Sequence, residues 1–199
     1  MKFALLLMTL VVGQAFGNTV GLSTHPFSMK KNALSAGIDN YFSNGEGTGF
    51  SARYLRRINQ SLNVDAGFGF TDGDRSSRFF AGADYEIIPD YGRQPRVSIK
   101  GLLENTDFDG DTVNSIGFAP TISKGFSFWG EEGYPFLSLP YRIHLNDDTG
   151  EYETAIGLTL GMTGNLPIDD FRNLIGNIEA TIDIDNNYSA LVLGIGYAL

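Results

Sequence analysis

The sequence predicts an all-β protein, an up-and-down antiparallel β-barrel of about ten strands, with eight strands as the nearest alternative. Three observations lead to this fold class. Apolar and polar residues alternate through most of the chain after residue 32. Short clusters of Gly, Asn and Asp separate the alternating segments, and such clusters favour hairpin loops. We find no segment of useful length with the 3.6-residue period of an amphipathic helix.

Each predicted strand is a run in which every second residue is apolar. The segment LNVDAGFGF (62–70) is the clearest, with Leu, Val, Ala and Phe on one face and Asn, Asp and Gly on the other. Two in-strand prolines, Pro120 and Pro140, fit less well because proline cannot donate to a strand ladder. In chain order the predicted strands are 33–42, 50–57, 62–70, 78–86, 96–103, 113–122, 135–145, 153–162, 174–184 and 189–199.

The N-terminus predicts export. Lys2 is followed by an apolar stretch, 3–12, and small residues at Ala15 and Gly17 fit a cleavage site before Asn18. The apolar stretch is too short for a membrane helix. We therefore expect residues 1–17 to be a signal peptide and residues 18–199 to form a single barrel domain.

Composition excludes some classes of function. The chain has 199 residues, no Cys, and 23 acidic against 14 basic residues, for a formal net charge of −9. An acidic protein lacks the basic face that nucleic acids require, so we expect no nucleic-acid partner. Without Cys the chain forms no disulfide and no thiolate metal site. We expect neither a cofactor nor a bound metal.

The polar faces of the strands indicate on which side the barrel is apolar. In 115–121 and in 155–161 these faces carry mainly Ser, Thr, Gly and Ala, with few charges. Such a face would cover a soluble barrel poorly, but it suits the crowded interior of a narrow barrel. The apolar face would then contact lipid, as in a transmembrane barrel. The connections expected to face outward are 43–49, 71–77, 104–112, 146–152 and 185–187.

From its signal peptide and residues 33–199, the chain resembles a small bacterial outer-membrane β-barrel protein with OmpA/OmpW-like architecture. The final strand carries the most specific part of this resemblance, although Leu199 departs from the usual terminal Phe. The resemblance implies location in the cell outer membrane, contact with its lipids and lipopolysaccharide, and recognition of the last strand by the barrel-assembly machinery. It leaves the oligomeric state open. The residues of that strand are Leu191, Leu193, Ile195, Tyr197 and Leu199.

The alternation also predicts charged side chains inside the barrel. They would line a narrow pore for small solutes, or they would pair and hold a structural barrel shut. We expect no enzyme. The alternatives are a membrane-embedded hydrolase centred on His144 and a secreted, soluble, lipocalin-like ligand-binding barrel. The predicted lumen-facing residues are Asp39, Arg53, Asp65, Asp84, Glu86, Lys100, Arg142, His144, Glu179 and Asp183.

Overall fold

The computed structural model describes residues 20–24, 31–43, 46–72, 75–108, 110–128, 131–168 and 173–199. The expected signal peptide, residues 1–17, lies outside the described residues and stays a prediction. So does the single-domain boundary at residue 18.

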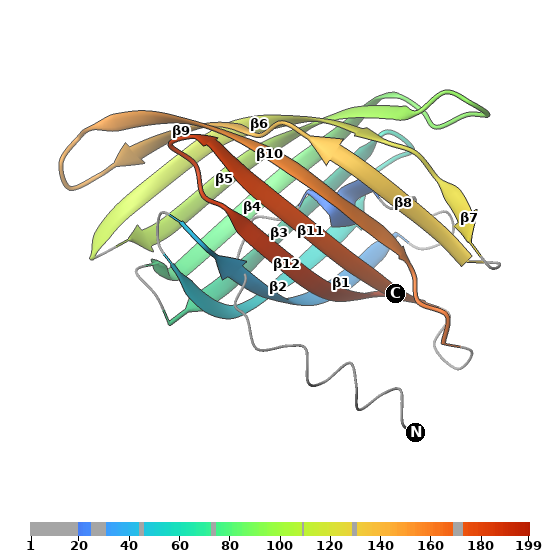
Figure 1. Cartoon of the computed structure of the whole chain (residues 1–199), viewed down its shortest axis with the longest axis horizontal. Coiled ribbons are helices and arrows are strands. Elements are labelled where there is room, and N and C mark those ends of the chain that lie inside the picture. The colour runs from blue at the N-terminus through green and yellow to red at the C-terminus, as the bar shows by residue number, and fades with distance from the viewer. Residues whose placement is uncertain are drawn as a thin grey trace.

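The described chain forms a closed barrel of tilted antiparallel strands (Figure 1). A short 3-10 helix, η1 (Gly21–Thr24), precedes the strands. The strands are β1 (Asn32–Tyr41), β2 (Gly47–Arg57), β3 (Leu62–Thr71), β4 (Arg75–Ile88), β5 (Arg96–Phe108), β6 (Asp111–Ser123), β7 (Phe126–Phe128), β8 (Glu131–Ser138), β9 (Tyr141–Asn146), β10 (Tyr152–Asn165), β11 (Leu174–Asp185) and β12 (Ala190–Ala198).

The barrel wall has ten strand positions, as the alternation predicts. β8 and β9 together fill one position between β6 and β10, and among the described strands β7 pairs only with β8. The first and last strands close the ring, with Ala33 opposite Ala198. The fold class and the up-and-down topology are therefore confirmed, and the eight-strand alternative is wrong.

Two details differ from the sequence-based expectation. The expected outer connection 104–112 is mostly strand, because β5 runs to Phe108 and β6 starts at Asp111. Polar side chains pair across this hairpin, as in the 2.9 Å hydrogen bond from Asn105 to Asn114. The expected strand 135–145 is interrupted after Ser138, next to Pro140, which has no N–H to donate to the ladder.

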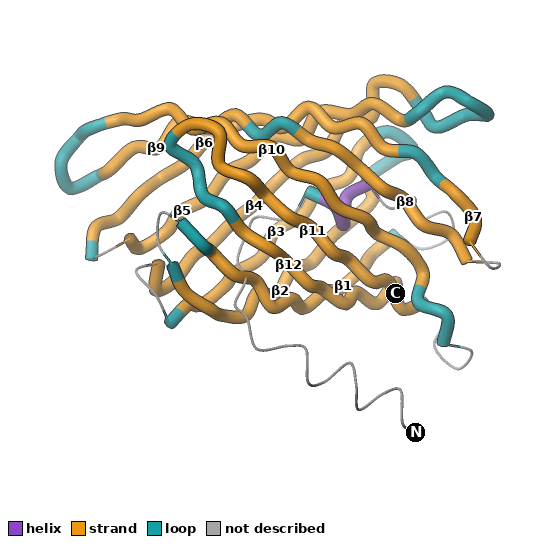
Figure 2. The backbone as a smooth tube through the Cα atoms, in the orientation of Figure 1, coloured by secondary structure: helices purple, strands orange, loops and turns teal. Residues whose placement is uncertain are grey.

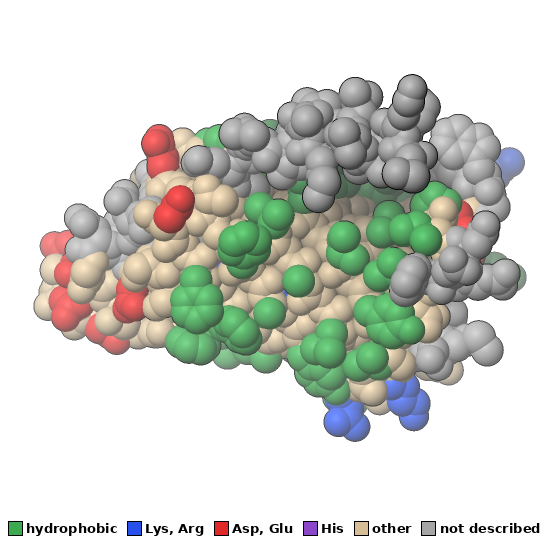
Figure 3. All heavy atoms as spheres, turned by 90° about the horizontal axis from the view of Figure 1, so that it is seen from below, with side chains coloured by type: hydrophobic (Ala, Val, Ile, Leu, Met, Phe, Trp, Pro, Cys, Tyr) green, Lys and Arg blue, Asp and Glu red, His purple; other side chains and the backbone are tan. Residues whose placement is uncertain are grey.

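The outer surface of the barrel is apolar. Large side chains are exposed on every position of the wall, among them Leu103 on β5 and Ile116 on β6, which are 54% and 60% exposed. Figure 3 shows hydrophobic side chains spread over the barrel wall, with acidic side chains gathered at one end. Most of the buried side chains are polar or charged instead. This inverted distribution is that of a transmembrane barrel, whose closed ladder leaves no backbone group unpaired in lipid.

Glycines on one strand make room for large side chains that point inward from the next. Phe80 pairs directly with Gly67, and Phe136 pairs with Gly161. A Cβ atom on Gly67 would lie 2.4 Å from the Phe80 ring, and one on Gly161 would lie 2.7 Å from the Phe136 ring. The small polar faces seen in the sequence therefore receive bulky neighbours from adjacent strands.

The short helix η1 lies within the barrel (Figure 2). It contacts β3, β8, β10 and β11, and all its residues are buried. Among the described residues, no helix is long and apolar enough to cross a membrane.

Candidate functional site

The structure places the predicted lumen-facing residues in two groups. Seven are buried inside the barrel: Asp39, Arg53, Asp65, Asp84, Lys100, Arg142 and Glu179. Three are half-buried, nearer the barrel ends: Glu86, His144 and Asp183.

In the half of the lumen nearer to Ala33 and Ala198, which we call the inner half, Asp65 lies between two cations. Its Oδ1 is 2.8 Å from Lys100 Nζ, and its Oδ2 is 3.6 Å from Arg53 Nε. Lys100 and Asp65 have side chains that are 0% and 1% exposed. Glu179 lies close enough for the charges of Arg53 and Lys100 to act on it. Asp65 therefore has two cationic partners within one buried cluster, in keeping with the need of buried charges for partners.

Arg96 binds two carboxylates on the neighbouring strand. Its Nη2 is 2.8 Å from Asp84 Oδ2, and its Nε is 2.8 Å from Glu86 Oε2. Its Nη1 also donates to Ser98 Oγ at 2.8 Å. The Arg96 side chain therefore links β4 to β5 inside the barrel, because its planar guanidinium offers several donors in a fixed geometry.

Closer to the outer end, two arginines and two tyrosines form a second layer. Arg78 Nη2 donates to Asp39 Oδ2 at 2.5 Å. Arg142 Nη1 donates to the hydroxyl of Tyr188 at 2.8 Å. The Tyr41 and Tyr188 rings meet edge to face, with centroids 4.6 Å apart. These side chains come from β1, β4, β9 and the β11–β12 connection, so the layer reaches across the lumen.

Together the two layers close the described lumen. Asp39 and Lys100 are 0% exposed, and Arg53, Arg78 and Arg142 are at most 5% exposed. A water-filled channel past these side chains would leave them accessible to solvent. The interior at this depth is therefore packed rather than open.

Three charged residues of this network were absent from the sequence prediction. Arg78 and Arg96 are the first residues of the predicted strands 78–86 and 96–103, and they share the alternation parity of Asp84 and Lys100, so the same alternation would have included them. Glu104, which accepts a hydrogen bond from Thr106 at 3.0 Å, lies beyond the predicted end of its strand at residue 103.

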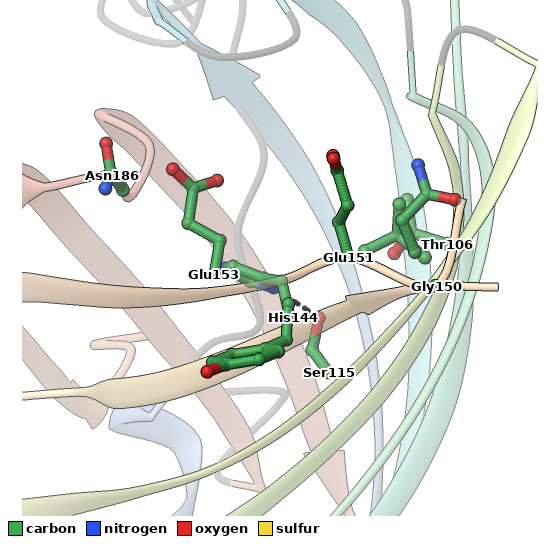
Figure 4. A pocket seen from close by; sticks show the side chains of 10 residues that line it. Thr106, Ser115, His144, Gly150, Glu151, Glu153 and Asn186 are labelled. Carbon is green, nitrogen blue, oxygen red and sulfur yellow. Dashed lines mark hydrogen bonds between the residues drawn. The ribbon is translucent and has the colours of Figure 1, made fainter. Parts of the chain in front are cut away.

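A vestibule of about 840 Å³ opens at the outer end, and His144 lines it (Figure 4). Ser115 Oγ and His144 Nδ1 are 2.6 Å apart, joined by a hydrogen bond whose donor depends on the histidine tautomer. Ser115, His144 and Glu153 stand directly opposite one another on β6, β9 and β10. In Figure 4 the Glu153 carboxylate points away from His144.

The last strand presents its apolar residues to the outside. Leu193, Ile195, Tyr197 and Leu199 are 38–57% exposed, whereas Ala190 and Val192 point inward and are 2% exposed. Leu191 shares the outward parity and is half-buried. The strand is paired on both sides, with β1 and with β11.

Within the described residues, no group of three or more His, Asp or Glu side chains is placed to hold a metal ion. The carboxylates of the lumen instead face Arg and Lys, as in the Asp65–Lys100 and Asp84–Arg96 pairs.

No protein-family model matches the chain, and no curated protein matches it. Among solved structures it is similar to the KdgM porin, with 11% identity over 84% of this chain and 99% of that one, at a TM-score of 0.36. It is also similar to Ail, the attachment invasion locus protein of Yersinia pestis, with 12% identity over 85% and 95%, at 0.31. OccAB2 of Acinetobacter baumannii shares 10% identity over 83% and 59%, at 0.25. Overlaps this loose assign neither substrate nor role.

Proposed function

We propose that this protein is an integral outer-membrane β-barrel whose lumen is a narrow route for small solutes, held shut at rest by its own side chains. The observation that carries the proposal is the inverted barrel with a paired charge network inside. A lipid-exposed wall supports the membrane location, because antiparallel barrels of this kind are typical of the bacterial outer membrane. The packed Arg–Tyr and Lys–Asp layers support a closed resting state rather than a wide diffusion pore.

Heat-modifiability and conductance test this proposal together. The protein in isolated outer membranes should migrate differently on SDS gels before and after boiling, because a closed barrel resists unfolding by detergent. In planar bilayers the folded protein should show a mostly closed channel with brief, small openings. A soluble protein with no shift on boiling would refute the membrane barrel. A large, permanently open conductance would refute the closed lumen.

The proposal includes two sets of partners. The outward apolar residues of β12, ending in Tyr197 and Leu199, would be the strand that the barrel-assembly machinery recognises. The acidic outer connections, which include Asp147 and Asp148, would approach lipopolysaccharide phosphates through shared divalent cations. Loss of outer-membrane insertion on depletion of the assembly machinery would support the first contact, and insertion at the normal level would count against it.

The Ser115–His144 contact favours a second candidate, a hydrolase in the outer vestibule. A serine within hydrogen-bond distance of a histidine is the starting arrangement for nucleophilic catalysis. A fluorophosphonate probe should then label the wild-type barrel, and Ser115→Ala should abolish the labelling. Unlabelled, correctly folded wild-type protein would eliminate this candidate.

A further inference from the structure

The barrel wall binds the backbone of residues 20–24 through a matching set of polar groups. Glu179 Oε1 accepts a hydrogen bond from the Val20 N–H at 3.0 Å, and Oε2 accepts one from the Gly21 N–H at 2.9 Å. One buried carboxylate therefore receives two consecutive peptide amides. Hydrogen bonds of this kind, with a charged acceptor, are among the stronger ones in proteins.

Other wall residues bind the carbonyl groups of the same segment. Asn63 Nδ2 donates to the Ser23 carbonyl at 3.2 Å. Thr163 Oγ1 donates to the Gly21 carbonyl at 3.4 Å and lies 3.1 Å from the hydroxyl of Thr24. The wall thus accepts hydrogen bonds from two amides at the start of the segment and donates to two of its later carbonyl groups.

Two apolar pockets receive the side chains of the segment. Val20 packs in one pocket, and Leu22 packs in the other, close to the end where the chain termini of the barrel meet. The wall residues are Leu102, Ala119 and Phe136 around Val20, and Ala33, Leu55, Ile175 and Ala198 around Leu22.

Between the pockets, the wall leaves no room for a Cβ atom unless the Asn177 or Phe136 side chain shifts. A Cβ atom on Gly21 would lie 2.5 Å from both Asn177 Oδ1 and Phe136 Cε1. The same edge of the Phe136 ring, atoms Cε1 and Cζ, also lies beside Gly161. We therefore expect a larger residue at position 21 to displace the segment from the wall.

We propose that the inner half of the lumen is a peptide-binding site, selective for a short apolar–Gly–apolar segment, and that residues 20–24 fill it reversibly. The segment carries no charge, so its departure leaves the internal ion pairs intact. On departure, Glu179 would lose its two amide donors and would keep the charges of Arg53 and Lys100 nearby. The same segment supplied as a separate peptide would bind an emptied site.

The first experiment measures accessibility in the full-length chain, which has no native Cys. A Leu22→Cys thiol should react with maleimide slowly in the folded barrel. Adding Gly21→Leu should accelerate the reaction at least tenfold, and so should Val20→Asp, which places a charge in the first pocket. Lys31→Ala, at an exposed position, is the matched control and should leave the rate unchanged. The gel shift on boiling verifies that each variant is folded.

The second experiment measures binding by fluorescence anisotropy. A labelled peptide of the sequence NTVGLST should bind the Gly21→Leu full-length barrel saturably, and at least tenfold more tightly than it binds wild type, whose site is filled. The same peptide with Leu in place of its Gly should not bind. Protection of the Leu22→Cys thiol in both ejecting variants would overturn the proposal. So would an absence of peptide binding to a folded barrel whose thiol has become reactive. Neither readout depends on conductance, so the proposed pore function is tested separately.

Discussion

Removing the Lys100 charge should destabilise the barrel strongly, because it leaves Asp65 buried beside a weaker partner. The Lys100 Nζ–Asp65 Oδ1 distance is 2.8 Å, and both side chains are at most 1% exposed. Loss of one partner from such a pair typically costs about 3–5 kcal/mol. Arg53 remains 3.6 Å from Asp65, so we expect Lys100→Met to cost about 3 kcal/mol, at the low end of that range.

The double variant Asp65→Asn/Lys100→Met separates the charge effect from a packing effect. It removes the charges of both partners of the 2.8 Å contact, whereas each single variant leaves the charge of the other partner buried. The summed losses in the free energy of unfolding of the two single variants should therefore exceed the loss of the double variant by about 2–3 kcal/mol, as for contacting residues. Denaturant unfolding of the detergent-folded barrel, followed by the fluorescence of its single Trp, measures all four free energies. The reasoning would be refuted if each single variant lost less than about 1 kcal/mol of unfolding free energy and the double variant lost the sum of the two.

Three further predictions concern the outer wall, the outer layer and the last strand. Ile116→Arg should reduce the free energy of unfolding in lipid vesicles by about 2–4 kcal/mol, because it places a charge in the hydrocarbon, whereas Asp147→Arg in an outer connection should change it by less than about 0.5 kcal/mol. Equal effects of the two would contradict a lipid-facing Ile116. Tyr188→Phe should cost about 1.5–3 kcal/mol in the same measurement, because Arg142 loses its hydroxyl acceptor at 2.8 Å; an unchanged midpoint would show that this bond contributes nothing. Tyr197→Ala should lower the outer-membrane fraction of the protein in cells several-fold while leaving refolding in detergent unchanged, and a parallel loss in both would indicate a folding defect instead.

The alternation predicts the wall of the barrel well because every strand has one face toward lipid and one toward a packed interior. That constraint is enough to assign residues such as Asp65 and Lys100 to the inward face. It does not define where a strand ends, so the predicted strand 96–103 stops short of Glu104. Alternation cannot place a segment that does not alternate. The sequence therefore did not predict that residues 20–24 lie in the lumen. Their place depends on contacts with Glu179 and Phe136, which are distant in sequence.

The distinction between a pore lining and a paired plug also lies beyond the sequence. Ten inward charged or ionisable residues are compatible with either, because the alternation gives the direction of a side chain and not its partner. In the structure these charges are paired, as in the contacts from Asp39 to Arg78 and from Asp84 to Arg96, and this pairing favours the plug. To predict such pairs, one must know which residues of neighbouring strands lie side by side. Local sequence does not specify this register.

Lipid quenching tests the inverted barrel most directly. Single Cys substitutions at Leu103, Ile116 and Ile178, each labelled with an environment-sensitive fluorophore, sample three strands of the wall, and Asp147→Cys provides a control in an outer connection. In vesicles containing nitroxide-labelled lipids, the three wall positions should be quenched strongly by the lipid probe and little by aqueous iodide, and the control should show the reverse. Quenching of the wall positions by iodide and not by lipid would mean that the apolar face lies elsewhere, and it would contradict the account.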